Sequence, residues 1–167
     1  GDPRTSEISI LAPSVRDKSM APEGCGTLTL FMPAYMDYQN DWLTTRDENG
    51  NIIRGEAYKQ LKQDIAKTII ERIDKHLAPG LCDHILFYDV ATPVTHWRYT
   101  GNKNGTMMGA KPGKQNMQNN IAHYQTPVKN LLLGGHWAEL GGGVPIAVKA
   151  GFNAALLVMK KENPAAF

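Results

Sequence analysis

A run of glycines between two apolar segments constrains this chain more than any other feature. Residues 130–133 contain three consecutive leucines, two glycines follow them, and residues 141–143 are three glycines that precede an apolar stretch beginning at Val144. This order predicts a short buried strand, a glycine loop, and a helix with Pro145 in its first turn. Glycines let a ligand approach the backbone, and the first amides of a helix favour an anion. The pattern therefore predicts either a ligand site or a tight turn whose glycines serve only packing.

An amphipathic helix is the clearest single element. Lys75 and His76 suit its C-terminal end, and Pro79-Gly80 stops it. The spacing predicts a helix over residues 56–77 that covers a sheet with its apolar face. The apolar positions that recur every three or four residues are Tyr58, Leu61, Ile65, Ile69, Ile73 and Leu77.

Strand-like composition appears in four segments, residues 7–12, 27–32, 84–91 and 95–99. Asn49-Gly50 is a hairpin signal before Ile52. The fold class that we expect is α+β, with an antiparallel or mixed sheet under the amphipathic helix and a C-terminal strand and helix. We expect the chain to divide into two parts, residues 1–125 and residues 126–167.

Composition excludes several classes of protein. Hydrophobic residues make up 42% and charged residues 20% of the chain, and the formal net charge is +2. These values are typical of a globular protein and argue against nucleic acid as a partner. Cys25 and Cys82 do not form a disulfide framework, and neither the cysteines nor His84, His96 and His123 have the spacing of metal ligands. The chain has no apolar run that we expect to span a membrane, so we expect a cytoplasmic protein.

Several segments together resemble the family of phytoene desaturases, carotenoid isomerases and retinol saturases. Residues 126–155, TPVKNLLLGGHWAELGGGVPIAVKAGFNAA, resemble the C-terminal FAD-binding segment of that family. DKSMAPEG at residues 17–24 and TLTL at residues 27–30 resemble its Asp-Pro-Ser-Leu-Ala-Pro-Glu-Gly loop and the strand after it. ATPVT at residues 91–95 and RYTG at residues 98–101 resemble its Thr-Pro-Leu-Thr and Arg-Tyr/Phe-x-Gly segments. Residues 105–109 resemble its Gly-x-x-Tyr-Gly segment, with Met108 in place of the aromatic residue.

The resemblance implies an FAD-dependent oxidoreductase that acts on double bonds of a long apolar isoprenoid. It also implies that residues 1–125 are part of a substrate domain and that residues 126–167 are the C-terminal FAD-binding segment. It assigns no catalytic residue, because the flavin itself performs hydride chemistry. The family also opens with a strand, G-x-G-x-x-G and a helix, and this chain has no such motif. We therefore expect the chain to be part of a longer enzyme, to be inactive alone and to hold FAD poorly. The cofactor-binding residues that the resemblance implies are Gly134, Gly135, His136, Trp137, Gly142, Gly143, Val144, Pro145 and Ala147.

Two other interpretations remain open at this point. One is a stand-alone module that binds an apolar ligand or a partner chain without chemistry. The other is an FAD-dependent enzyme of the amine oxidase type, although those usually line the flavin with aromatic residues and this loop offers only Trp137. His136 and Trp137 either contact the flavin or only pack the loop. The C-terminal helix is apolar on almost every side, so we expect self-association of the chain, and a peripheral contact with a membrane also stays open.

Overall fold

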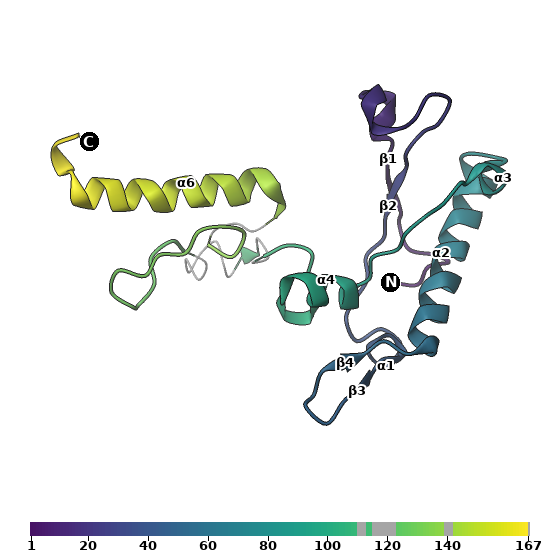
Figure 1. The fold of residues 1–167 in the computed structure, drawn as a ribbon, viewed down its shortest axis with the longest axis horizontal. Coiled ribbons are helices and arrows are strands. Elements are labelled where there is room, and N and C mark those ends of the chain that lie inside the picture. The colour runs from purple at the N-terminus through teal and green to yellow at the C-terminus, as the bar shows by residue number, and fades with distance from the viewer. Residues whose placement is uncertain (110–112, 115–122, 139–141, 167) are drawn as a thin grey trace. The chain divides into compact units, whose positions relative to one another are not determined.

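The computed structural model describes residues 1–109, 113–114, 123–138 and 142–166. The chain divides into two compact units, Gly1–Gly105 and Thr106–Phe167 (Figure 1). The boundary that we expect after residue 125 differs from the division between the two compact units, and it stays a prediction.

The first unit begins with two paired strands. β1 (Ser9–Leu11) and β2 (Thr29–Phe31) run antiparallel, which confirms the strands expected near residues 7–12 and 27–32. The loop between them contains the short helices η1 (Pro13–Val15) and η2 (Lys18–Met20). Among the described residues, no further strand pairs with β1 or β2, so the larger sheet that we expected does not form.

A left-handed turn and a hairpin follow. In α1 (Gln39–Leu43) every residue has a positive φ, and Trp42 is buried with its indole N–H donated to the carbonyl of Tyr35 at 2.9 Å. β3 (Thr45–Arg46) and β4 (Ile52–Ile53) then form an antiparallel pair, which confirms the hairpin signal at Asn49-Gly50.

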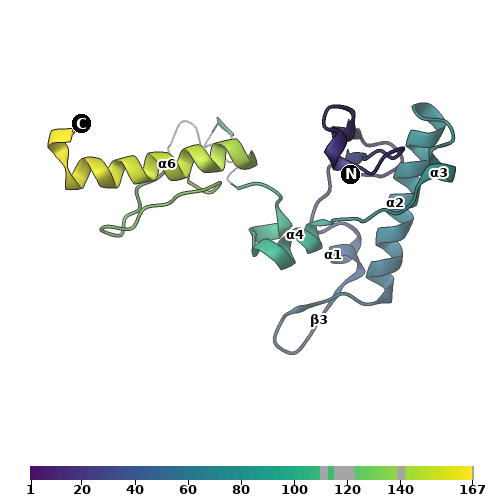
Figure 2. The same cartoon turned by 45° about the horizontal axis from the view of Figure 1, so that its top comes forward.

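The predicted amphipathic helix is confirmed as α2 (Glu56–His76), and its apolar stripe forms the core of this unit. Tyr58 and Ile65 on α2 pack with Trp42 of α1 and with Val94, which is fully buried. The helix therefore covers neighbouring helical segments rather than the sheet that we expected. Figure 2 shows α2 with α3 (Leu81–His84) at its C-terminal end.

The strands expected at residues 84–91 and 95–99 are wrong. His84 ends α3, the residues up to Thr92 form no regular element, and α4 (Pro93–Thr100) is a helix. The reason is local. The Thr92 side chain accepts a hydrogen bond from the Thr95 amide, the Thr95 hydroxyl accepts one from the Thr92 amide, and Pro93 presets the first helical turn.

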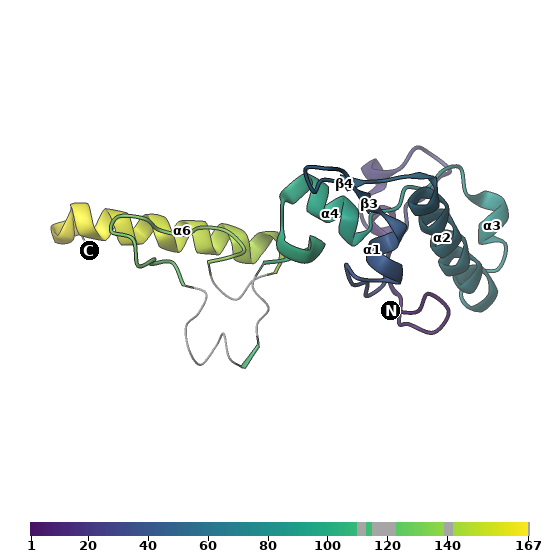
Figure 3. The same ribbon diagram turned by 90° about the horizontal axis from the view of Figure 1, so that it is seen from below.

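The second unit is built on α6 (Gly143–Glu162), which confirms the C-terminal helix. The strand expected at residues 130–133 is reduced to one bridge between Gln125 and Leu132. Asn130 has a positive φ and the Leu131 amide bonds to the carbonyl of Val128, so the chain turns where the strand would have run. Figures 1 and 3 show this turn-rich segment running beside α6.

Two polar contacts and one apolar face define α6. The Asn153 amide donates to the Tyr124 hydroxyl at 2.8 Å, and the Lys161 ammonium donates to Asn130 Oδ1 at 2.7 Å. Ala150 and Ala154 are buried on this inner face. By length and composition alone, α6 is the one helix of the described residues that could cross a membrane, whereas we expected no such segment. The outer, exposed face carries Val144, Val148, Phe152 and Met159.

Candidate functional site

The expected cofactor residues lie at two turns of the second unit. The first turn comprises residues 134–138, and the second comprises Gly142 and the start of α6. Both lie in the described part of the chain, whereas Gly141 of the glycine triplet and the neighbouring Glu139 lie outside it. The structure of each turn shows why glycine stands there.

The first turn depends on Gly135. Its φ of 93° is one that side chains other than glycine rarely adopt, and its carbonyl accepts the amide of Ala138 at 3.1 Å. His136 and Trp137 lie at the tip with their rings edge to face and 5.7 Å apart. Ala138 is fully buried, while 42% of Trp137 is exposed. The turn is therefore held in place by the buried Ala138, and part of the Trp137 ring faces solvent.

The second turn begins α6 with two glycines of positive φ. Gly142 has φ 93° and Gly143 has φ 71°, and Pro145 is in the first turn as predicted. Val144 is 76% exposed, so little of its side chain packs against the protein. The first amides of any α-helix lack a partner within the helix. Without side chains at Gly142 and Gly143, this end of α6 can accept an electron-rich group close to its backbone.

Gly134 has a packing role instead. A β-carbon at Gly134 would lie 3.3 Å from the Cα of Gly151 in α6, which is tighter than most such contacts. The absence of a side chain at Gly134 lets the loop lie close to the backbone of α6 at Gly151. This contact supports the interpretation that Gly134 serves packing.

A third segment reaches both turns and was not among the expected site residues. A β-carbon at Gly109 would overlap the carbonyl of His136 and the amide of Trp137, so the two backbones are in contact. A β-carbon at Gly142 would lie 3.1 Å from the Met108 sulfur. Residues 105–109 carry part of the family resemblance, and the glycine at position 109 was the signal that could have placed them at this site.

Other segments that carry the resemblance have structural roles. The Asp17 carboxylate accepts the Ser19 amide at 3.0 Å and its hydroxyl at 2.7 Å, and these bonds lower the pKa of Asp17 as they cap η2. Thr92 caps α4 and bonds to the buried Tyr58 hydroxyl at 2.9 Å. Gly101 ends α4 in a left-handed conformation. Each of these residues holds the backbone of the first unit.

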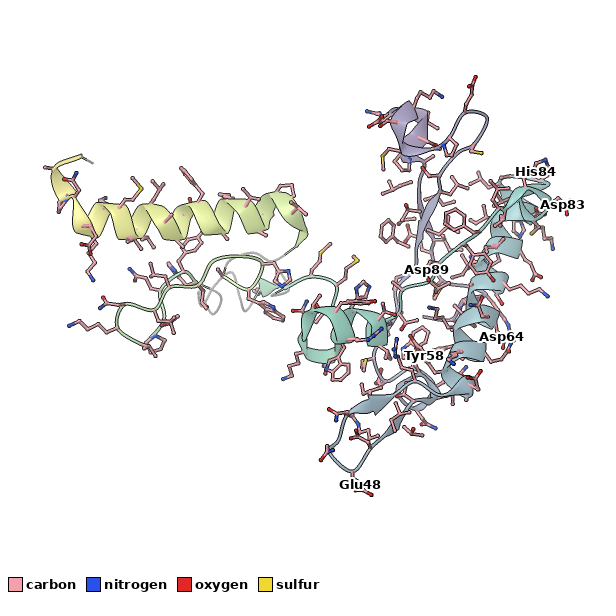
Figure 4. All side chains as sticks on the ribbon, viewed as in Figure 1. Glu48, Tyr58, Asp64, Asp83, His84 and Asp89 are labelled. Carbon is pink, nitrogen blue, oxygen red and sulfur yellow. The ribbon has the colours of Figure 1, made fainter. Side chains whose placement is uncertain are left out.

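Titratable side chains of the first unit are distributed over several elements. In Figure 4, Tyr58 lies between α2 and the start of α4, Asp83 and His84 lie at α3, and Asp89 lies on the segment between α3 and α4. Among the described residues there is no group of three His, Cys, Asp or Glu side chains that could hold a metal ion. The described residues of this unit thus offer no metal centre.

Comparison with known proteins relates the chain to a family. Prolycopene isomerase of Arabidopsis thaliana chloroplasts is 33% identical over 99 residues, which are 59% of this chain and 15% of that protein. All-trans-retinol 13,14-reductase of Danio rerio is 29% identical over 140 residues, which are 81% of this chain and 22% of that protein. The chain is a relative of these isomerases and reductases. The resemblance to the carotenoid isomerase and retinol saturase family is therefore confirmed.

The relationship extends along nearly the whole chain. Pyridine nucleotide-disulfide oxidoreductase domain-containing protein 2 of Rattus norvegicus is 29% identical over 164 residues, 92% of this chain and 25% of that protein. The chain thus spans between 15% and 25% of the length of the relatives named here. No protein-family model and no solved structure matches it.

Proposed function

We propose that this chain is part of a longer FAD-dependent oxidoreductase that acts on the double bonds of a long apolar isoprenoid. The observation that carries the proposal is the turn of Gly142 and Gly143 at the start of α6, with residues 106–109 and His136-Trp137 packed around it. Relatives named for prolycopene and retinol support the substrate class.

The residues at this turn fit a flavin. The two glycines leave the backbone open, the helix start offers amide donors and a positive dipole end, and the exposed Trp137 offers an aromatic surface. Gly135, His136, Val144, Pro145 and Ala147 complete the proposed cofactor segment. Bound flavin would supply the redox chemistry. The residues of this chain would bind one part of it, orient the ring and keep water from the reacting double bond.

The chain by itself supplies only part of such a site. It contains no G-x-G-x-x-G segment, which in dinucleotide-binding folds seats the pyrophosphate at a helix N-terminus. We propose that another part of the longer enzyme holds the adenosine end of FAD and covers the outer face of α6. The 167-residue chain alone would then be inactive and would associate with itself through that face.

The apolar substrate also favours a location at a membrane surface. Long isoprenoids partition into lipid, so an enzyme that takes them up benefits from peripheral contact with a bilayer. The exposed apolar face of α6 is compatible with such contact. A cytoplasmic location is part of the same proposal.

The deciding experiment uses the longer protein. It should be expressed, purified and examined for the visible absorbance of bound flavin, before and after incubation with FAD. A flavin spectrum is expected, together with conversion of prolycopene or all-trans-retinol in an anaerobic or aerobic assay followed by chromatography. Protein without flavin after reconstitution contradicts the cofactor, and turnover of a simple amine in place of both polyenes contradicts the substrate class.

A further inference from the structure

Large apolar side chains gather around the glycine turn at the start of α6. Met107 is 53% exposed, Met108 is 46% exposed and Trp137 is 42% exposed. Single exposed apolar residues are common on proteins and need no explanation. Here, however, the backbone contacts place the three residues in one neighbourhood.

The contacts are made by glycines. Gly109 packs backbone to backbone on His136 and Trp137, which fixes Met108, the preceding residue, close to the same loop. The Met108 sulfur in turn lies where it would be 3.1 Å from a β-carbon at Gly142. Met108 therefore touches the turn at the start of α6, and Trp137 is presented by the turn that Gly109 supports.

The described residues of this neighbourhood, 106–109, 135–138 and 142–145, carry no Asp, Glu, Lys or Arg side chain. The amides at the start of α6 suit an electron-rich group of the cofactor, but no side chain of these residues offers an ion pair to a charged peptide. An uncharged, flat and flexible apolar ligand suits this surface, because a thioether adapts its shape and makes favourable contacts with π systems.

We propose that Met108 and Trp137 form the contact surface for the conjugated chain of an apolar isoprenoid beside the glycine turn. This assignment rests on the proposed function and adds to it the residues that meet the substrate. Trp137 provides a rigid flat face, and Met108 provides an adaptable one between that face and the start of α6. The expected consequence is that Met108 affects the affinity for the polyene and not the retention of flavin.

The test uses all-trans-retinol with the longer protein, in detergent, and two independent readouts. Retinol binding is followed by energy transfer from tryptophan and by retinol's own fluorescence, and flavin content is measured by absorbance. Met108→Ala should weaken retinol binding by about fivefold, which corresponds to about 1 kcal/mol. Met108→Leu should stay within about twofold because it keeps the apolar volume. Trp137→Phe should lower energy transfer while retinol still binds.

The matched control is Met20→Ala, because Met20 is a methionine of similar exposure, 51%, in the other unit. It should leave retinol binding unchanged, and the two Met108 variants and Met20→Ala should keep the flavin content of the unaltered protein. If Met20→Ala and Met108→Ala weaken retinol binding equally, retinol associates with exposed apolar side chains in general, and the proposal is overturned. Loss of flavin in Met108→Ala places that side chain at the cofactor and also overturns it. Binding of retinol that depends on Met108, in a protein without flavin, supports this inference and rejects the proposed cofactor.

Discussion

At the scale of single residues, the missing side chain of Gly143 is the most consequential feature of the site. Its φ of 71° costs an L-residue about 1–2 kcal/mol, so a substitution tests conformation and ligand approach together. Gly24 separates the two effects, because it has φ 76° and open space around it. The two glycines thus form a matched pair.

We predict that Gly143→Ala lowers the flavin content of the longer protein severalfold, whereas Gly24→Ala does not. Both variants should lose a similar stability, about 1–2 kcal/mol, in urea unfolding because both adopt the same strained conformation. Flavin absorbance per protein is the measurement. Equal flavin in the two variants would show that the glycines at the start of α6 form only a turn.

Cys82 provides a second residue-scale prediction. Partial desolvation, followed by the charge and hydrogen bonding of the nearby Asp74, raises the pKa of the Cys82 thiol. A raised pKa means less thiolate at a given pH, and the thiolate is the reactive form. In a Cys25→Ser background, Cys82 should therefore react with iodoacetamide more slowly than free cysteine at pH 8, and its rate should keep rising at higher pH.

The neighbouring carboxylate tests the cause. Asp74→Asn should speed alkylation of Cys82, while Asp64→Asn, two to three turns earlier on α2, should leave the rate unchanged. Identical rates for the two variants would rule out Asp74 as the source of the slow reaction.

The sequence could predict the glycine turns at this scale but not their neighbours. Gly135, Gly142 and Gly143 stand out in the sequence because glycine is the residue that tolerates their positive φ. Met108 and Gly109 reach the site only through tertiary packing. Both residues are far from Trp137 along the chain, so no local sequence pattern indicates that they contact it.

At the scale of elements, the join between α2 and α4 supports the first unit. Tyr58 is 3% exposed and its hydroxyl bonds to Thr92 Oγ1 at 2.9 Å, next to the capping box of α4. The bond thus links the core face of α2 to the residue that starts α4. Removing the hydroxyl leaves the aromatic ring in place.

We predict that Tyr58→Phe destabilises this unit by about 1 kcal/mol, the usual net value of a buried hydrogen bond. Urea unfolding followed by far-UV circular dichroism is the measurement. Tyr88→Phe is the control, since the Tyr88 hydroxyl donates to Gln63 on the exposed surface at 2.8 Å and its loss should cost little. A Tyr58→Phe protein as stable as the unaltered chain would contradict this account.

The helices were predictable from the sequence where their periodicity was long, and strands were less so. α2 repeats its apolar stripe over 21 residues, a pattern that no strand can match. Residues 85–88 have an apolar composition that fits a strand, but a strand needs a paired neighbour, and composition does not supply one. A helix start is indicated by Thr92 followed by Pro93, with Thr95 three residues after Thr92. This signal outweighs the strand-like composition of α4.

At the scale of the whole molecule, the absence of a G-x-G-x-x-G segment from this chain predicts weak cofactor binding. We expect the isolated 167-residue chain to bind FAD with a dissociation constant above about 1 μM. A fluorescence titration with FAD measures it. Submicromolar affinity, equivalent to more than about 8 kcal/mol, would show that residues 126–167 suffice for the cofactor.

The exposed face of α6 leads to a second whole-molecule prediction. Val148 is 67% exposed and Phe152 is 61% exposed, and a large apolar patch usually marks an interface. The isolated chain should therefore self-associate in sedimentation experiments at increasing concentration, and Val148→Lys or Phe152→Lys should shift it toward monomer. Val15→Lys, at a site 70% exposed in the other unit, should not. A strict monomer at all concentrations would contradict the prediction.

The conformation of the glycines along α6 also determines where the chain can be engineered. Gly151 lies in the body of the helix with open space where a β-carbon would go, so alanine there should be accepted and even favoured by its helix propensity. Gly142 and Gly143 occupy positive φ, so every replacement that a codon change can produce there brings strain. Within a few turns of one helix, the chain therefore holds a position that is open to stabilising design and two at which every replacement lowers stability.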